Sequence, residues 1–348
     1  MRQAPGHHRA RAHGHADRAH ARAYAHAFGS PARLPAPEGE WSPFRTWGVR
    51  RAGADAGAGA LRRWGRPAWQ DVLVFCLLLV GAAWCVWRAT RLPQYHWQWP
   101  VLGEFLLRRG ADGHWEAGLL LQGLGVTLRI GFWSMLLALL TGTPVGLASA
   151  HARGLSALPS RVWVTIIRNT PPLVLLFFLY FFAGNLLPVT ALEDAIRELP
   201  EALRAAVDVG FAPPGQMDRM LAAVLALGLY EGAYVAEIVR GGVESVPAGQ
   251  WDAARALGFS RGQSLRLVIL PQTARVVLPP LVGQTISTFK DSALASLISL
   301  PELTFQSLEV MAVSQMTFEI WISAGALYLF VGLACAGAGR WLERRSAY

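Results

Sequence analysis

Six long apolar runs constrain this chain more than any other feature of its sequence. They cover about residues 71–88, 118–149, 161–188, 217–240, 266–290 and 316–341. A helix needs roughly 20 apolar residues to cross a bilayer, and each run is long enough, although the first is near the lower limit. Backbone polar groups in lipid must be hydrogen-bonded within the protein, which helices achieve. The sequence therefore predicts an all-α membrane protein with six transmembrane helices.

The charges between the runs predict how these helices are oriented. The loop at 150–168 carries three Arg and no acid, whereas the loop at 189–218 carries six acids against two Arg. The segment 240–266 again has four Arg against two acids, and the chain ends "RWLERRSAY". Arg-rich loops remain on the cytoplasmic side of the membrane. Six spans with both termini in the cytoplasm satisfy every loop.

Residues 1–70 differ in composition from the rest of the chain. They are rich in Ala, Arg and His, with 12 Arg against four acids, and account for most of the net charge of +9. Such a segment buries too little apolar surface to fold, so we expect a disordered basic cytoplasmic tail. A metal-binding cluster is the alternative, and an upstream translation start would also explain the composition, but no regular ligand spacing is visible. The six histidines are His7, His8, His13, His15, His20 and His26.

The sequence gives little support for a disulfide framework, a metal site, an enzyme, a nucleic-acid-binding protein or a secondary transporter. The three cysteines, Cys76, Cys85 and Cys335, lie in apolar runs without disulfide or metal-ligand spacing. No HExxH motif is present, so we expect no metal site and no enzyme. The positive charge is concentrated in the tail, and no nucleic-acid partner is expected. A secondary transporter would show an internal repeat, and none is visible between the halves.

The segment 246–271 is polar although it lies between two apolar runs. Pro247 suits a first helical position, and Gly258 supplies a left-handed residue that ends a helix. Ser260 and Gln263 have the spacing of a capping box that starts a second helix. The segment is therefore expected to form a helix–turn–helix in the cytoplasm.

One face of its first helix is small and apolar. Ala253, Ala254 and Leu257 share that face at helical spacing. Another protein could approach such a shallow surface closely. An interfacial helix on lipid headgroups is the alternative, but alanine side chains provide little buried area to hold it there.

The stretch "DAARALG", followed by "VILP", resembles the EAA loop of type I ABC importer permeases. Asp252 replaces the usual Glu, and Val268 stands where Ile is usual. The stretches "AYVAEIVRGGVESVPAGQWDAARALG", "LPQTARVVLPPL" and "FKDSALASLISLPELT" are similar to the polar amino-acid branch of that family (histidine, glutamine or general L-amino-acid type). The resemblance covers residues 118–341, which it identifies as an ABC transmembrane type-1 domain preceded by an extra span at 71–88.

The resemblance implies a permease that moves amino acids across the bacterial inner membrane by alternating access. The partners it implies are a cytoplasmic ABC ATPase dimer, a second permease subunit (identical or related), a periplasmic solute-binding protein and membrane lipid. A permease for another small solute remains the main alternative, and a secondary transporter a weaker one. The residues expected to contact the ATPase are Gln250, Asp252, Ala253, Ala254, Leu257, Gly258, Leu270 and Pro271.

ATP and Mg are expected on the partner ATPase and no cofactor on this chain. A nucleotide-binding P-loop needs a lysine after its glycines. The one lysine of the sequence is Lys290, within "STFKDSA", where no such loop exists.

Ionisable residues inside spans usually face a cavity or a partner. Glu231 lies deep in the fourth run with no local cation, so it is a candidate for the translocation pathway. Glu237 lies three residues before Arg240, where a structural ion pair is expected. Lys290 either belongs to the pathway or extends to the outer interface from a helix end. The further candidates beside Lys290 are Ser287, Thr288, Asp291 and Ser292.

Removing residues 1–60 should leave uptake unchanged, because Arg62, Arg63 and Arg66 remain to hold the N-terminus in the cytoplasm. The measurement is uptake of labelled amino acid at matched membrane levels of the full and shortened chains. Loss of uptake by a normally expressed shortened chain would assign a function to the tail.

Overall fold

The computed structural model describes residues 69–90, 95–151, 154–183, 188–213 and 215–346, and the chain divides into one unit up to Pro93 and another from Gln94. The predictions for residues 1–68 of the tail lie outside the described residues. In the first unit, α3 (Trp69–Thr90) coincides with the first apolar run, and Val72–Gly81 is its apolar stretch. That stretch is shorter than a membrane-crossing helix, so the sixth span stays a prediction.

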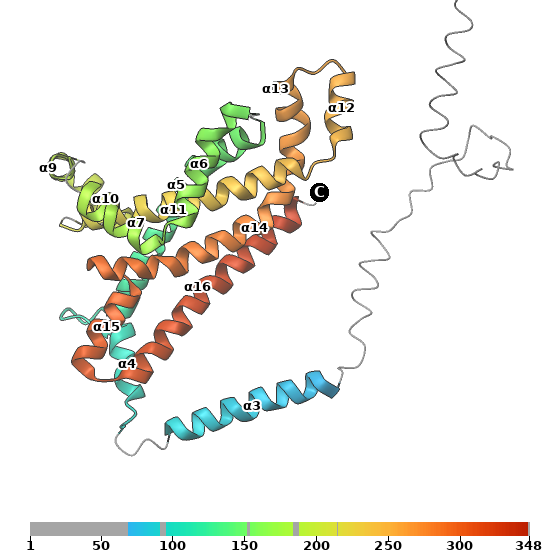
Figure 1. Ribbon diagram of the computed structural model, residues 1–348. Coiled ribbons are helices and arrows are strands. Elements are labelled where there is room, and N and C mark those ends of the chain that lie inside the picture. The colour runs from blue at the N-terminus through green and yellow to red at the C-terminus, as the bar shows by residue number, and fades with distance from the viewer. Residues whose placement is uncertain (1–68, 91–94, 152–153, 184–187, 214, 347–348) are drawn as a thin grey trace, which may run out of the picture. The chain divides into compact units, whose positions relative to one another are not determined.

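The second unit contains four helices that are long and apolar enough to cross a membrane. They cover Leu119–Ala150, Met217–Glu244, Arg261–Ile298 and Thr317–Arg345. The corresponding elements are α5 (Leu119–His151), α11 (Met217–Glu244), α14 (Leu270–Asp291) with its flanking turns, and α16 (Thr317–Ser346) (Figure 1). These are the second, fourth, fifth and sixth predicted runs.

The third predicted run is broken rather than continuous. It consists of α6 (Leu158–Asn169) and α7 (Pro172–Phe178), which continues as the π-helix η2 (Leu179–Ala183). The two parts meet at 102°. A residue before proline avoids the α conformation, and Thr170, before Pro171, is extended with φ −91° and ψ 128°. Counting this pair as one span gives five.

Shorter elements connect the spans. They are α4 (Trp99–Leu106), β1 (Leu107–Arg109), β2 (Trp115–Ala117), η1 (Gly154–Ala157), α9 (Val189–Arg197), α10 (Glu201–Gly210), η4 (Ser292–Ile298) and α15 (Leu303–Ser314). β1 and β2 form an antiparallel hairpin in which Leu107 faces Ala117. This hairpin is the one departure from the all-α prediction among the described residues.

The most extensive contact between two described spans joins α5 and α11. A Cβ added at Gly142 would lie 2.3 Å from the carbonyl oxygen of Gly232, and one at Gly146 would lie 2.4 Å from that of Ala236. Gly142 and Gly146 form a GxxxG pattern on α5, and Gly228 and Gly232 form another on α11. Such patterns let the backbones of membrane helices approach closely. The glycines therefore fix the distance between the two spans.

Buried apolar side chains extend this contact to neighbouring elements. Ile130 of α5, Leu176 of α7, Leu227 of α11 and Ala295 of η4 belong to one buried cluster. The broken third span is thus anchored to the α5–α11 pair through α7.

Glu302 joins α5, α15 and α16 through hydrogen bonds. Its fully buried carboxylate caps α15 by accepting from the N–H groups of Thr304 and Phe305, at 2.9 and 2.8 Å. It also accepts from Tyr328 Oη of α16 at 2.8 Å and from Thr127 Oγ1 of α5 at 3.3 Å. Burial raises the pKa of this carboxyl, and the donated hydrogen bonds oppose that shift.

Gly142→Ala and Gly146→Ala should each destabilise the protein by about 1–3 kcal/mol, because the new methyl group would meet a backbone oxygen that no rotamer change can move. Thermal unfolding in detergent measures the effect. Gly125→Ala on the same helix is the control, since its Cβ meets nothing within 4 Å. Equal midpoints for all three variants would contradict the proposed packing.

Candidate functional site

A helical hairpin follows α11 and leads into α14. Its first arm is α12 (Ala248–Ala256), and its second arm consists of α13 (Arg261–Gln263) and the π-helix η3 (Ser264–Ile269). Figure 1 shows the two arms side by side, extending beyond the end of α11. The two helices and the turn predicted at 246–271 are present, and their location in the cytoplasm stays a prediction.

The first arm ends at a glycine-dependent turn. Gly258 has φ +82°, its N–H donates to the Arg255 oxygen at 2.9 Å, and the Phe259 N–H donates to the Ala254 oxygen at 3.1 Å. These bonds form a Schellman motif, which requires a left-handed residue. The prediction for Gly258 is confirmed. Pro247 is the residue before the helix, with ψ 140°, and not the first helical residue as predicted.

The second arm begins with the predicted capping box. Gln263 N–H donates to Ser260 Oγ at 3.3 Å, and Ser260 N–H donates to Gln263 Oε1 at 2.8 Å. Residues 258–262, "GFSRG", also match the G-x-S-x-G pattern of hydrolases, which needs a strand before the serine and a helix after it. Here the serine lies between two helices and its side chain caps one of them, so the match carries no catalytic meaning.

The three residues predicted to share one face of α12 are divided in the structure. Ala253 is exposed and Leu257 is 75% exposed, but Ala254 is 2% exposed and is buried within the hairpin. The turn at Gly258 brings the second arm back along α12, and periodicity alone does not reveal which side that arm covers. The exposed face of α12 therefore includes Ala253 and Leu257 without Ala254.

The other predicted contact residues also surround the hairpin. Gln250 is exposed and accepts a hydrogen bond from Gln272 at 3.3 Å. Asp252 pairs with Arg255, and both line a cavity of about 720 Å³ between α12 and the end of α11. At the start of α14, Leu270 is half-buried and Pro271 exposed.

The base of the hairpin is a small apolar cluster. Val243, Val246 and Ile269 are buried there, and Leu147 of α5 and Trp251 of α12 pack against them. The hairpin is thereby fixed to the ends of α5 and α11.

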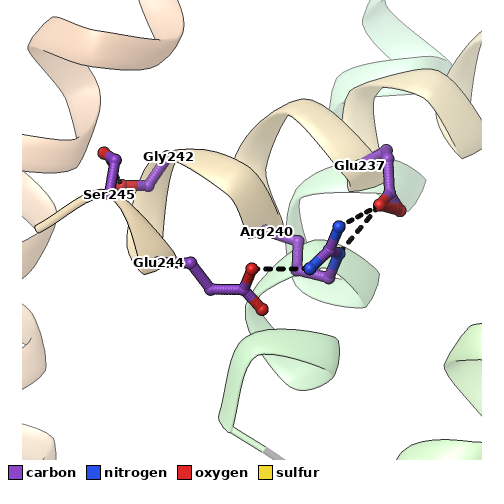
Figure 2. Close-up of polar contacts among 5 residues, drawn as sticks. All are labelled: Glu237, Arg240, Gly242, Glu244 and Ser245. Carbon is purple, nitrogen blue, oxygen red and sulfur yellow. Dashed lines mark hydrogen bonds and ion pairs between the residues drawn. The ribbon is translucent and has the colours of Figure 1, made fainter.

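Two acids hold an arginine at the same end of α11. Figure 2 shows Arg240 between Glu237 and Glu244, with Arg240 Nη1 donating to Glu244 at 2.6 Å. Arg240 also pairs with Glu237, which confirms the predicted ion pair. Pairs at these spacings stabilise the helix turn that they span.

α11 contacts α14 beside these charges. A Cβ at Gly242 would lie 2.2 Å from Val277 Cγ1, so only glycine permits this approach. Ser245 Oγ donates to the Gly242 oxygen at 2.7 Å and closes the last turn (Figure 2). The two spans that flank the hairpin are therefore packed against each other where the hairpin begins.

A second group of candidates lies deeper, between α11 and α14. Glu231 is fully buried and accepts a hydrogen bond from Gln284. Its other oxygen has no partner among the described residues, and the Asp291 carboxyl is its neighbour. Lys290 precedes Asp291 on the same helix, and its side chain is exposed. Sequence reasoning missed Gln284, although it lies seven residues before Asp291 and hence on the same helix face.

The predicted hydroxyl groups mostly bond to their own helix. Thr288 Oγ1 donates to the Gln284 oxygen at 3.0 Å and Ser292 Oγ to the Phe289 oxygen at 2.7 Å, and both side chains are buried. Ser287 is half-buried. Across the described residues, no three His, Cys, Asp or Glu side chains gather as metal ligands would.

Several known transport proteins are similar to this chain in sequence or in structure. The chain is 35% identical over 231 residues to the glutamine transport system permease protein GlnP of Escherichia coli, covering 65% of this chain and 92% of that one. It is 33% identical over 240 residues to the probable glutamine ABC transporter permease protein GlnP of Bacillus subtilis, covering 68% and 97%. A crystal structure of an amino acid ABC transporter with histidines matches at 30% identity and a TM-score of 0.52, over 65% of this chain and 94% of that one.

Residues 142–348 match the family described as binding-protein-dependent transport system inner membrane component. This match includes α11, the hairpin, α14 and α16, which carry both groups of candidate residues. The chain therefore belongs to the family of inner-membrane components of binding-protein-dependent transport systems, the permeases of ABC importers.

Proposed function

We propose that this chain is the membrane subunit of an ATP-driven importer for amino acids, most of them polar. The observation that carries the proposal is the hairpin α12–η3 between two spans, with an exposed face on α12. The substrate class is supported by the named glutamine permeases and by the amino acid transporter at 30% identity.

The hairpin is the surface for a cytoplasmic ATPase dimer, which binds ATP and Mg. Ala253 and Leu257 form the exposed contact face of α12, and the Asp252–Arg255 pair offers charges beside it. A small side chain allows close approach, as at other helix contacts in this protein. Force on α12 passes through the apolar base at Val243 and Ile269 into α11 and α14.

The loop charges and the family support the rest of the proposed transporter, namely its orientation and its other subunits. Both termini face the cytoplasm, six spans cross the inner membrane, and a second permease subunit of the same or a related kind completes the pore. A periplasmic solute-binding protein delivers the substrate at the opposite end. The positive-inside distribution of loop charges supports this orientation.

A zwitterionic substrate needs partners for both of its charges in a medium of low dielectric constant. Glu231 is proposed to bind the ammonium group, since it is buried and one of its oxygens has no donor. Lys290, with Ser287, Thr288 and Ser292, is proposed to meet the carboxylate, and Asp291 to assist Glu231. Binding would require rotation of the hydroxyl groups away from their own helix.

Purification of the chain from native membranes with its co-purifying subunits tests the assignment. Proteoliposomes of that complex should take up labelled glutamine or histidine only with ATP and the binding protein. Uptake driven by an ion gradient alone would indicate a secondary transporter. ATP-driven uptake of a different solute would retain the permease and overturn the substrate class.

Gly258→Val should abolish uptake while the protein still inserts. A β-branched residue at φ +82° is strained by more than the roughly 1–2 kcal/mol of an ordinary left-handed residue, so the turn must change and α12 loses its docking position. The measurement is uptake together with ATP hydrolysis by the assembled complex.

Gly258→Asn is the matched control, because asparagine tolerates the left-handed conformation. It should retain most of the uptake. Wild-type uptake by Gly258→Val at normal membrane levels would show that the turn is not needed for coupling.

Glu231→Gln and Lys290→Met should each lower uptake at least severalfold, because each removes a charge offered to the substrate. Gln has the shape of Glu and keeps the contact with Gln284, and removing a buried charge that has no cationic partner leaves stability unchanged or higher. Uptake and thermal unfolding are measured on the same preparations.

Glu193→Gln, in the predicted outer loop, is the control and should transport normally. Reduced uptake with unchanged stability supports a role in the pathway. Normal transport by both Glu231→Gln and Lys290→Met would show that backbone and neutral groups line the pathway.

A further inference from the structure

A second cavity lies beside α11, at residues that precede those lining the cavity next to the hairpin. It has a volume of about 510 Å³ and lies between the end of α5, α6 and α11. Three arginines and one acid line it, namely Arg161, Arg168, Arg240 and Glu237. The cavity is therefore cationic, although neither transport nor coupling as described above uses it.

Two of these arginines are available for a ligand. Arg240 is held by Glu237 and Glu244. Arg161 and Arg168 have no carboxylate within ion-pair distance among the described residues, and the Arg168 guanidinium lies over the Tyr234 ring at 5.0 Å from its centre. Stacking of this kind orients a guanidinium and leaves its N–H groups free at the edge. An anion is the complementary ligand.

The polar groups beside these arginines suit a phosphate. Thr165, Asn169 and Ser149 also line the cavity, and each carries a hydroxyl or amide donor. Arg binds phosphate through two parallel hydrogen bonds. Arg161, Thr165 and Arg168 recur at the spacing of one helix face, so their donors point toward one region.

The neighbouring face of α6 is apolar and uncovered. Leu158, Val162 and Ile166 form a stripe at i, i+4 and i+8, and they are 48%, 49% and 59% exposed. A soluble phosphate or a small acidic metabolite would leave this stripe without a partner. A ligand with both a phosphate and an acyl chain would satisfy both faces.

The position of α6 agrees with a membrane surface. α6 meets α7 at 102°, so the two halves of the pair cannot both follow the membrane normal. A helix with an Arg-bearing face and an apolar face lies in the interface, with the apolar face toward the acyl chains. The Arg-rich loop 150–168 places this interface on the cytoplasmic side.

We propose that the cavity between α5, α6 and α11 binds the phosphate of an acidic phospholipid of the cytoplasmic leaflet. Arg161 and Arg168 hold the phosphate, and an acyl chain follows Leu158, Val162 and Ile166. Basic cavities between membrane helices on this side are suited to such headgroups. A bound lipid would tie α6 to the cytoplasmic end of α11, where the hairpin begins.

The test uses the purified full-length chain in neutral detergent, titrated with phosphatidylglycerol that carries one fluorescent acyl chain. Phosphatidylcholine with the same label is the reference lipid. Wild-type protein should prefer phosphatidylglycerol, and the Arg161→Gln/Arg168→Gln double variant should bind it about 10- to 30-fold more weakly, as expected for loss of two surface cations.

The matched control is Arg340→Gln/Arg344→Gln, which removes two exposed charges from α16 on the same predicted side. It should bind as the wild type does. Val162→Ser/Ile166→Ser should also weaken lipid binding, because it removes the apolar stripe and keeps both arginines. Size-exclusion profiles confirm that all variants are folded.

Four results would overturn the proposal. Equal binding of the two lipids, or equal loss in the α16 control, would show that no specific headgroup site exists. Displacement of the lipid by inorganic phosphate at millimolar concentration would assign the cavity to a soluble anion. Displacement by glutamate and not by phosphate would assign it to the transport pathway.

Discussion

The backbone contact between α5 and α11 determines the arrangement of this protein. Apolar helices in lipid gain nothing from burying one another's side chains, so their association depends on close packing. Gly142 and Gly146 remove the side chains that would keep the helices apart. As a result, 67% of the most apolar part of α11 is buried, against 17% for Arg261–Ile298 and for Thr317–Arg345. α11 is the central helix, and each functional group described above lies on it or is attached to it.

This central position explains why α11 carries polar residues in apolar surroundings. Glu231 is costly to bury, and its burial is tolerated because Gln284 approaches from α14. Glu237, Arg240 and Glu244 satisfy one another near the end of the helix, where water is closer. Polar side chains that bond within one helix need no partner from elsewhere, whereas Glu231 depends on a second span.

Local signals predicted the hairpin in detail. The turn at Gly258 and the capping box at Ser260 depend on residues at most five positions apart, so the sequence contains all the information that they need. Hydropathy predicted the spans because it, too, is a property of each stretch of sequence by itself. The burial of Ala254 and the partner of Glu231 depend on which segments meet in space, and one sequence does not reveal this. The GxxxG patterns and the pair Pro171–Pro172 are local signals of the helix contact and of the broken span.

The second arm of the hairpin has a mechanical consequence. Helical structure runs without a sharp break from Arg261 to Ile298, through Pro279 and Pro280, over 38 residues. At a rise of about 1.5 Å per residue this is a rod of about 57 Å, roughly twice the thickness of the hydrocarbon core. One end belongs to the hairpin and the other lies beyond Asp291. A lever of this length turns a tilt of about 5° at the hairpin end into a displacement of about 5 Å at the far end. The pathway can therefore open at one side of the membrane without a large deformation of the helix at the other side.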